Sequence, residues 1–220
     1  MNDDHFLRQQ DVLDASKLGH LGITLIGLGS IGSITGLALS KLGIVGLQAF
    51  DADYVEVHNW ANQMYADNDI GSLKTTAFTR LLEAYGGQTP NAIAQRYVDQ
   101  DLTEVVISAV DSMESRKIIW KSVREKSDVR LYLDARMGLE TLIVYAIRPQ
   151  IREDRVVYSQ SLVPDDQALQ EPCTARTICY TPLMASSIVC NFVKRFVNDE
   201  EIPRRIVLDL ATFTLMVDHR

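Results

Sequence analysis

The stretch Gly22-Ile-Thr-Leu-Ile-Gly-Leu-Gly-Ser-Ile-Gly32 decides the fold of this chain. Residues 22–28 form a short apolar run with β-branched members, which predicts a buried parallel strand. The glycines then follow the spacing Gly-x-Gly-x-x-Gly, and residues 33–42 combine small and apolar side chains, as in a helix that ends at Gly43. A second apolar run, residues 46–50, predicts the next strand. This succession of strand, glycine turn, helix and strand begins a doubly wound α/β sheet.

The rest of the chain extends this sheet. We predict strands at 92–98, 105–110 and 131–133, and helices at 74–85, 112–125 and 183–197. Beyond residue 134 the pattern predicts strands at 140–148, 155–162, 205–210 and 212–217, and a polar loop at 163–177. The expected fold is therefore Rossmann-like, with a mostly parallel mixed sheet and antiparallel strands added in the C-terminal third. We expect residues 1–220 to form one domain, with a nucleotide-binding core at about 20–134 and a substrate region at about 135–220.

Composition narrows the range of functions. The formal net charge of −7 disfavours nucleic-acid binding, which needs clustered Lys and Arg to replace phosphate counterions. The sequence contains neither a signal-peptide core near its start nor an apolar run of about 20 residues, the length that crosses a bilayer. We therefore expect a cytoplasmic protein that does not contact membranes. Three cysteines gathered late in the chain do not form a disulfide framework.

The glycine turn predicts a phosphate-binding site. Gly27 permits the tight turn, Gly29 lets the backbone approach phosphate oxygens, and Gly32 permits close packing of helix on strand. The N-terminus of the following helix offers unpaired N–H groups and a positive dipole end to an anion. Asp51, at the end of the next strand, can accept a hydrogen bond from a ribose hydroxyl. A nicotinamide dinucleotide and a mononucleotide such as ATP fit these residues equally well.

Further motifs resemble one family of nucleotide-binding proteins. Asp51-Ala-Asp53-Tyr-Val, then Asn59 and Gln63, resemble the Asp-x-Asp-x-Val and Asn-x-x-Arg-Gln elements of the ThiF/MoeB/HesA and ubiquitin-activating-enzyme family. Three further matches are Gly71-Ser-Leu-Lys74, the segment Asp111-Ser-Met-Glu-Ser-Arg116, and Leu7-Arg8-Gln9 near the start. The resemblance covers residues 7–134 and extends more weakly to residue 197. It implies a ThiF-type adenylation domain that binds ATP and Mg²⁺.

The resemblance also implies roles for individual residues. The nucleotide would be contacted by Gly27, Gly29, Ser30, Ile31, Gly32, Asp51, Asp53, Asn59, Asn62, Gln63, Lys74 and Asp111. Asp111 would hold Mg²⁺, Lys74 would contact phosphate, and Arg8 would reach across a homodimer into the partner's ATP site. Asn62 stands where the family carries a phosphate-binding arginine, and Arg136 is a candidate to replace that cation.

The late cysteines are expected to differ in role. Glu171-Pro-Cys173-Thr-Ala-Arg176-Thr177 resembles a Cys-Arg-Thr segment of the family, although two residues separate Cys173 from the arginine. The resemblance implies that the Cys173 thiol could accept the activated acyl group or sulfur. Cys179 is expected to be structural at a helix start, and Cys190 to lie in the core. The family's zinc cysteines are missing, so we expect no structural zinc.

Three hypotheses of function follow. The leading one is ATP- and Mg²⁺-dependent adenylation of a C-terminal carboxylate on a small ubiquitin-like or sulfur-carrier protein. The second is an NAD(P)-dependent oxidoreductase, which uses the same glycines and Asp51 but leaves Asn59, Lys74 and Asp111 without a role. The third is a non-catalytic pseudoenzyme that partners an active homologue. This hypothesis is based on Asn62, which stands where the family carries a phosphate-binding arginine.

Overall fold

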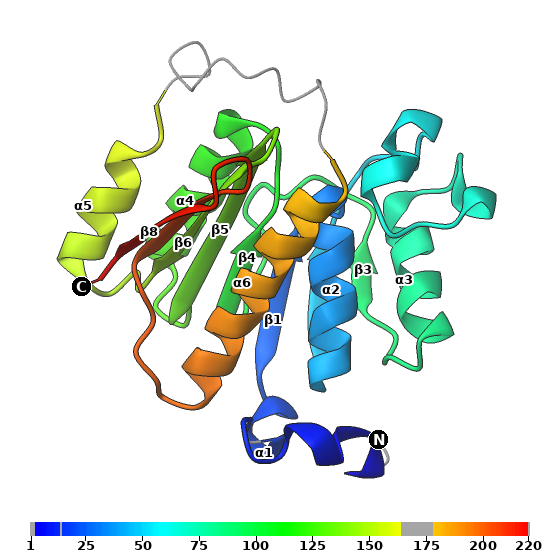
Figure 1. The fold of residues 1–220 in the computed structure, drawn as a ribbon, viewed down its shortest axis with the longest axis horizontal. Coiled ribbons are helices and arrows are strands. Elements are labelled where there is room, and N and C mark those ends of the chain that lie inside the picture. The colour runs from blue at the N-terminus through cyan, green and yellow to red at the C-terminus, as the bar shows by residue number, and fades with distance from the viewer. Residues whose placement is uncertain (1–2, 14, 164–177, 220) are drawn as a thin grey trace.

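A central β-sheet dominates the computed structural model, which describes residues 3–13, 15–163 and 178–219 (Figure 1). The eight strands lie in the order β3-β2-β1-β4-β5-β6-β7-β8. Their bounds are β1 Gly22–Ile26, β2 Gly46–Phe50, β3 Asn91–Ile93, β4 Val105–Ser108, β5 Leu131–Gly138, β6 Thr141–Ile147, β7 Arg205–Asp209 and β8 Thr214–Asp218. Strands β1 to β5 pair in parallel, whereas β6, β7 and β8 are added antiparallel. The expected fold class is confirmed.

Helices cover both faces of the parallel half of the sheet, which explains why its strands are continuous apolar runs. In β4, Val105 and Ile107 face one cluster of core side chains and Val106 faces another. The first cluster includes residues of α2 (Ser30–Leu42), α3 (Lys74–Ala84) and α6 (Tyr180–Val197). The second includes residues of α4 (Met113–Glu125) and α5 (Arg152–Gln160). Figure 1 shows α2 and α6 side by side over one face.

Two contacts on the first face fix how closely its helices approach. A Cβ atom at Gly36 of α2 would lie 2.2 Å from the ring of Phe78 in α3. Between α2 and α6, the buried Ser186 hydroxyl donates to the Ile31 carbonyl at 3.1 Å and accepts from Thr35 at 3.0 Å. Small and polar side chains thus set the spacing of this helical layer.

The N-terminal segment lies at the starting edge of the strands, away from the glycine turn (Figure 1). It contains a 3₁₀ helix, η1 (Asp3–Gln9), and the short α1 (Ala15–Leu18). The Gln9 side chain donates to the carbonyl of Lys41, at the C-terminal end of α2, at 3.0 Å. Two further 3₁₀ helices, η2 (Val57–Asn62) and η3 (Asp67–Asp69), lie between β2 and α3.

One predicted strand is wrong. Residues 155–162 were expected to be extended, but residues 152–160 form α5. Val156 and Val157 favour a strand locally. The helix forms because Asp154 and Tyr158, four residues apart, both turn inward, and the Asp154 carboxylate accepts from the Arg148 amide at 2.9 Å. β6 therefore pairs with β5 and β7 instead.

The last two strands differ from the rest of the sheet. β7 is partly exposed along its whole length, and β8 carries the exposed apolar side chains Leu215, Met216 and Val217 at the edge.

Within the described residues, no helix is both long and apolar enough to span a bilayer.

Candidate functional site

The glycine turn joins β1 to α2 and is shaped by two glycines, at which a Cβ atom would require the neighbouring backbone to shift. Gly27 has φ of +94°, and a Cβ there would lie 2.6 Å from the carbonyl oxygen of Ala109. A Cβ at Gly32 would lie 1.9 Å from the carbonyl oxygen of Gly27. A Cβ at Gly29, by contrast, would meet nothing within 4 Å. The space above Gly29 is therefore open, as an approaching phosphate group requires.

Helix α2 begins in this open space. Gly29 is its N-cap residue and has no side chain with which to cap the first-turn amides. Ser30 is half-buried, and Ile31 is buried with its carbonyl engaged by Ser186. A helix N-terminus with uncapped amides attracts anions through its N–H groups and its dipole. The predicted contacts of Gly29, Ser30 and Ile31 with a nucleotide are thus geometrically accessible at the backbone.

Asp51 follows β2 and braces the glycine turn. One carboxylate oxygen accepts from the Leu28 amide at 2.7 Å, and the other accepts from the Asp53 amide at 2.8 Å. Burial raises the pKa of the Asp51 carboxyl, although the nearby Lys74 charge and the two amides oppose that rise. Asp51 is therefore oriented by the same backbone that a nucleotide would approach.

Lys74 is the first residue of α3, and its side chain is largely buried. Its ammonium group lies 3.2 Å from a carboxylate oxygen of Asp53, whose side chain is exposed. The Lys74 amide also donates to the Asp53 carbonyl at 2.9 Å, so α3 begins directly against the residues that follow β2. The structure thus brings together Asp51, Asp53 and Lys74, three residues for which the family resemblance implied a contact with the nucleotide.

The segment between β2 and α3 leaves two buried polar atoms without partners. Asn59 and Asn62 lie on η2 and are half-buried, and Gln63, just after it, is buried. The side-chain oxygens of Asn62 and Gln63 are buried and have no hydrogen-bond partner among the described residues. Buried unpaired oxygens cost free energy, so such atoms mark a place where solvent or a ligand supplies the partner.

Tyr65 belongs to the site but was not predicted. Its buried hydroxyl donates to the Leu28 carbonyl at 2.6 Å, and the neighbouring Met64 amide donates to the Ser33 hydroxyl at 3.2 Å. Burial, followed by the charges of Asp51 and Asp69, raises the pKa of Tyr65 well above its usual value, so it remains a donor. Both backbone polar groups of Leu28 are therefore held by side chains from after β2.

Asp111 follows β4 at the same edge of the sheet and is exposed. The N-cap of α4 is Ser112, whose hydroxyl accepts from the Ser115 amide at 3.2 Å. Asp111 therefore does not cap the helix itself. Within the described residues no cluster of three or more His, Cys, Asp or Glu side chains could hold a metal ion. Asp111 could contribute one ligand to a cation that phosphate oxygens also bind.

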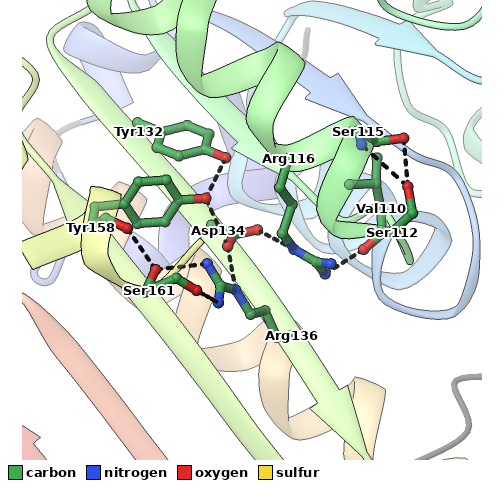
Figure 2. A network of polar contacts seen from close by, with 9 residues as sticks. All are labelled: Val110, Ser112, Ser115, Arg116, Tyr132, Asp134, Arg136, Tyr158 and Ser161. Carbon is green, nitrogen blue, oxygen red and sulfur yellow. Dashed lines mark hydrogen bonds and ion pairs between the residues drawn. The ribbon is translucent and has the colours of Figure 1, made fainter. Parts of the chain in front are cut away.

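Asp134 of β5 pairs in register with Ser108, the last residue of β4, but it is fully buried in a network of polar contacts (Figure 2). One of its oxygens lies 3.2 Å from Nε of Arg116, and the other lies 2.6 Å from Nε of Arg136. The two terminal nitrogens of Arg136 donate to the carbonyl and hydroxyl oxygens of Ser161. Since these contacts occupy its guanidinium, Arg136 is not placed to replace the missing phosphate-binding arginine.

Other predicted residues lie apart from this edge. Arg8 is exposed on η1, which contacts the far end of α2. Cys173 and the polar loop around it fall outside the described residues. Cys179 is exposed at the N-cap of α6, and Cys190 is buried, which raises the pKa of its thiol to about 12. The core position expected for Cys190 is confirmed.

Comparison with sequences gives a family match and distant relatives. A sequence model described as "ThiF family" matches residues 5–217. Ubiquitin-like modifier-activating enzyme 5 of Arabidopsis thaliana is 23% identical over 188 residues, which cover 82% of this chain and 42% of that protein. The Drosophila erecta protein of the same name is 26% identical over 140 residues, which cover 54% of this chain and 35% of that one. The chain thus spans less than half the length of these relatives.

Solved structures share the fold. Escherichia coli MccB, crystallised with AMPCPP and MccA, superposes with a TM-score of 0.76 at 17% identity, covering 99% of this chain and 72% of that one. PaaA superposes with a TM-score of 0.73 at 17% identity, covering 93% of this chain and 65% of that one. Both superpositions show that this chain shares the fold of these structures.

Proposed function

Because this chain belongs to the ThiF family, we propose that it binds ATP and uses it to adenylate the C-terminal carboxylate of another protein. The observation that carries the proposal is the open N-terminus of α2 at Gly29, beside Asp51. β1, β2 and β4 are parallel and end level with one another, so Lys74 and Asp111 lie at the same sheet edge. Ligands of such sheets bind at this edge.

These residues suit a nucleoside triphosphate. The glycine turn and the first turn of α2 would hold phosphate oxygens, Asp51 would accept from the ribose, and Lys74 would neutralise phosphate charge. Gln63 and Asn62 offer buried oxygens that still need partners. Mg²⁺ would be held by Asp111 together with the phosphates, where it neutralises charge and orients the triphosphate.

The proposed reaction joins a carboxylate to the α-phosphorus of ATP and releases pyrophosphate. A carboxylate is ionised at neutral pH, so it is nucleophilic without a general base. Negative charge moves onto the leaving pyrophosphate, and preplaced cations and helix dipoles stabilise that charge. Lys74 and the N-terminus of α2 are the groups of this chain that would do so.

We propose a small ubiquitin-like or sulfur-carrier protein as the substrate. The Arabidopsis and Drosophila relatives are named for activating a ubiquitin-like modifier, and MccB was crystallised with both a nucleotide analogue and MccA. Residues 1–220 would then form one cytoplasmic adenylation domain. After adenylation, the Cys173 thiolate could attack the acyl adenylate to form a thioester and release AMP, or it could accept sulfane sulfur from a persulfide donor.

A homodimer follows from the position of Arg8 if that residue contacts ATP. Within one chain it lies at the starting edge of the strands, opposite Gly29. A second copy could bring its Arg8 to this site. Mixing Arg8→Ala protein with Lys74→Ala protein tests the idea, because mixed dimers would regain one complete site. Activity that stays absent after mixing would show that Arg8 does not act across an interface.

Thermal unfolding separates the proposed function from its alternatives. At 100 times its dissociation constant, Mg·ATP should stabilise the protein by about 2.7 kcal/mol, and this shift should be lost in Lys74→Ala. Lys121→Ala, on the exposed face of α4, is the matched control and should keep the shift. Stabilisation by NAD(P) alone would instead identify an oxidoreductase.

Isotope exchange between pyrophosphate and ATP then tests the chemistry. We expect exchange only in the presence of a carrier protein with a free C-terminus. Asn62 motivates the alternative of a pseudoenzyme, because the family carries an arginine there. If Asn62→Arg creates exchange that the native chain lacks, the native site binds nucleotide without turning it over.

A further inference from the structure

Arg116 connects the buried network to the turn that carries Asp111 (Figure 2). Its side chain is almost fully buried on the first turns of α4. Nε donates to a carboxylate oxygen of Asp134 at 3.2 Å, and a terminal nitrogen donates to the carbonyl oxygen of Val110. Val110 immediately precedes Asp111, so one guanidinium joins the centre of β5 to the turn between β4 and α4.

Ser112, the residue after Asp111, is also held by hydrogen bonds to α4. The Ser112 hydroxyl accepts from the Ser115 amide at 3.2 Å and donates to the Ser115 hydroxyl at 2.8 Å. The Arg116 amide donates to the Ser112 carbonyl at 3.2 Å. Both neighbours of Asp111 are therefore fixed to α4, while the Asp111 side chain itself is exposed. The turn presents one carboxylate from a rigid support.

Asp134 is the anchor of this arrangement. Besides its two arginines, it accepts from the Tyr158 hydroxyl at 3.0 Å, and that hydroxyl lies 3.0 Å from the Tyr132 hydroxyl. Burial by itself disfavours the charged carboxylate, but Arg116 and Arg136 outweigh it and lower the pKa of Asp134. A buried ion pair contributes little net stability compared with apolar side chains of the same volume. Its better-attested contribution is to fix one conformation.

We propose that Arg116, held by Asp134, is a positioning residue that sets where the Asp111 carboxylate lies for the magnesium-bound nucleotide. The inference rests on the proposed function. Groups that orient a metal ligand from behind are worth roughly 10- to 100-fold in metal affinity. Arg116 acts one step further back, through the Val110 carbonyl, and its removal should weaken the magnesium-dependent part of nucleotide binding.

The experiment measures the affinity of a non-hydrolysable ATP analogue by calorimetry, with Mg²⁺ and with EDTA, for the full chain. The ratio of the two dissociation constants gives the contribution of magnesium. Arg116→Gln removes the charge, and Arg116→Lys keeps the charge but not the planar fork that bonds two acceptors at once. Asp111→Ala defines complete loss of the magnesium effect.

Arg204→Gln is the matched control. Arg204 pairs with buried Asp154 at 3.3 Å, and it precedes β7 beside the starting end of β5, at the opposite edge of the sheet. The variant breaks a buried pair of the same kind, so it reports what a general loss of stability does to binding. We expect it to retain the native magnesium ratio even where its melting temperature falls.

We expect Arg116→Gln and Arg116→Lys to lower the magnesium ratio about tenfold. In the Asp111→Ala background, the same substitutions should have no further effect, because they act through Asp111. Additive losses, or a native ratio in Arg116→Lys, would overturn the inference. A native chain without any magnesium effect would overturn both the metal role of Asp111 and this inference, whereas native magnesium dependence with unaffected Arg116 variants overturns the inference alone.

Discussion

Two clusters of acidic and basic side chains lie near the same edge of the sheet, and they differ in their exposure to solvent. Asp53 and Lys74 form an ion pair whose carboxylate is 59% exposed, whereas Asp134 pairs with Arg116 and is 0% exposed. Each cluster pairs an aspartate with a basic side chain, but Asp53 follows β2, whereas Asp134 lies within β5. Burial decides which charged side chains can contact a ligand and which contact only other side chains of the protein.

The largest expected effect on stability comes from breaking the buried cluster of Asp134, Arg116 and Arg136. Asp134→Asn removes the charge that compensates two buried arginines, and removing one partner of a buried pair costs about 3–5 kcal/mol. Asp53→Asn should change stability by less than about 1 kcal/mol, because Asp53 is exposed and Lys74 keeps the charge of Asp51 nearby. Urea unfolding of the two variants measures the difference. Equal losses would show that exposure does not separate the clusters.

The glycine turn allows a second comparison. Gly32→Ala places a methyl 1.9 Å from the Gly27 carbonyl oxygen, and such overpacking costs about 1–3 kcal/mol. Gly29→Ala meets no atom within 4 Å and should cost under about 1 kcal/mol, yet it should weaken ATP binding by occupying the open space. Melting temperature and nucleotide affinity, measured together, should therefore respond differently in the two variants. If Gly29→Ala binds ATP normally, the phosphates do not approach at this point.

Lys74→Ala tests whether the partly exposed cluster of Asp53 and Lys74 contributes to ATP binding. A hydrogen bond to a charged group is worth about 1.5–3 kcal/mol, so we expect ATP affinity to fall tenfold or more. Stability should fall by much less than in Asp134→Asn, because Asp53 remains exposed to solvent. Calorimetric titration with ATP and Mg²⁺ checks the affinity. A fully retained affinity would place the phosphates away from α3.

The smallest expected effect is a difference in pH dependence. The pKa of Asp134 is lowered in the folded protein, so its contribution to stability is present above about pH 4 and is lost as pH falls through the folded value. The pKa of Asp51 is raised, so its contribution is present below about pH 4 and is lost as pH rises through the folded value. We therefore expect Asp134→Asn to change the unfolding free energy mainly above about pH 4, and Asp51→Asn to change it mainly below about pH 4. Unfolding free energies measured between roughly pH 3 and pH 6 check this difference.

The sequence located β1, β2 and β4 well, since each of these apolar runs is followed within a few residues by glycine or aspartate. The bounds of two other parallel strands were wrong: β3 was predicted at 92–98 but spans Asn91–Ile93, and β5 was predicted at 131–133 but continues to Gly138. The family resemblance of its motifs also assigned Asp51, Asp53 and Lys74 to one site, and these residues lie together in the structure. It failed at α5, where Val156 and Val157 outweighed the inward turn of Asp154 and Tyr158. Local preference could not show that tertiary contacts would decide this segment.

Burial of single charges was equally hard to predict. Asp134 lies within β5 and Asp111 follows β4, and Arg116 and Arg136 both pair with Asp134, which local sequence could not show. Arg116 carried a signal, because it stands five residues after Asp111 in a recognised motif. Tyr65 carried none, since its contact with Leu28 depends on how an irregular segment folds back.

The missing side chain of Gly36 has a consequence for tolerance to mutation. Gly36 lies in the middle of α2, two turns from the nucleotide edge, and Phe78 fills the space where its Cβ would be. Phe78 belongs to the same helix that begins with Lys74. The distance between α2 and α3 therefore sets the position of Lys74 relative to the glycine turn. A single methyl group at position 36 would shift the lysine relative to the glycine turn without touching either.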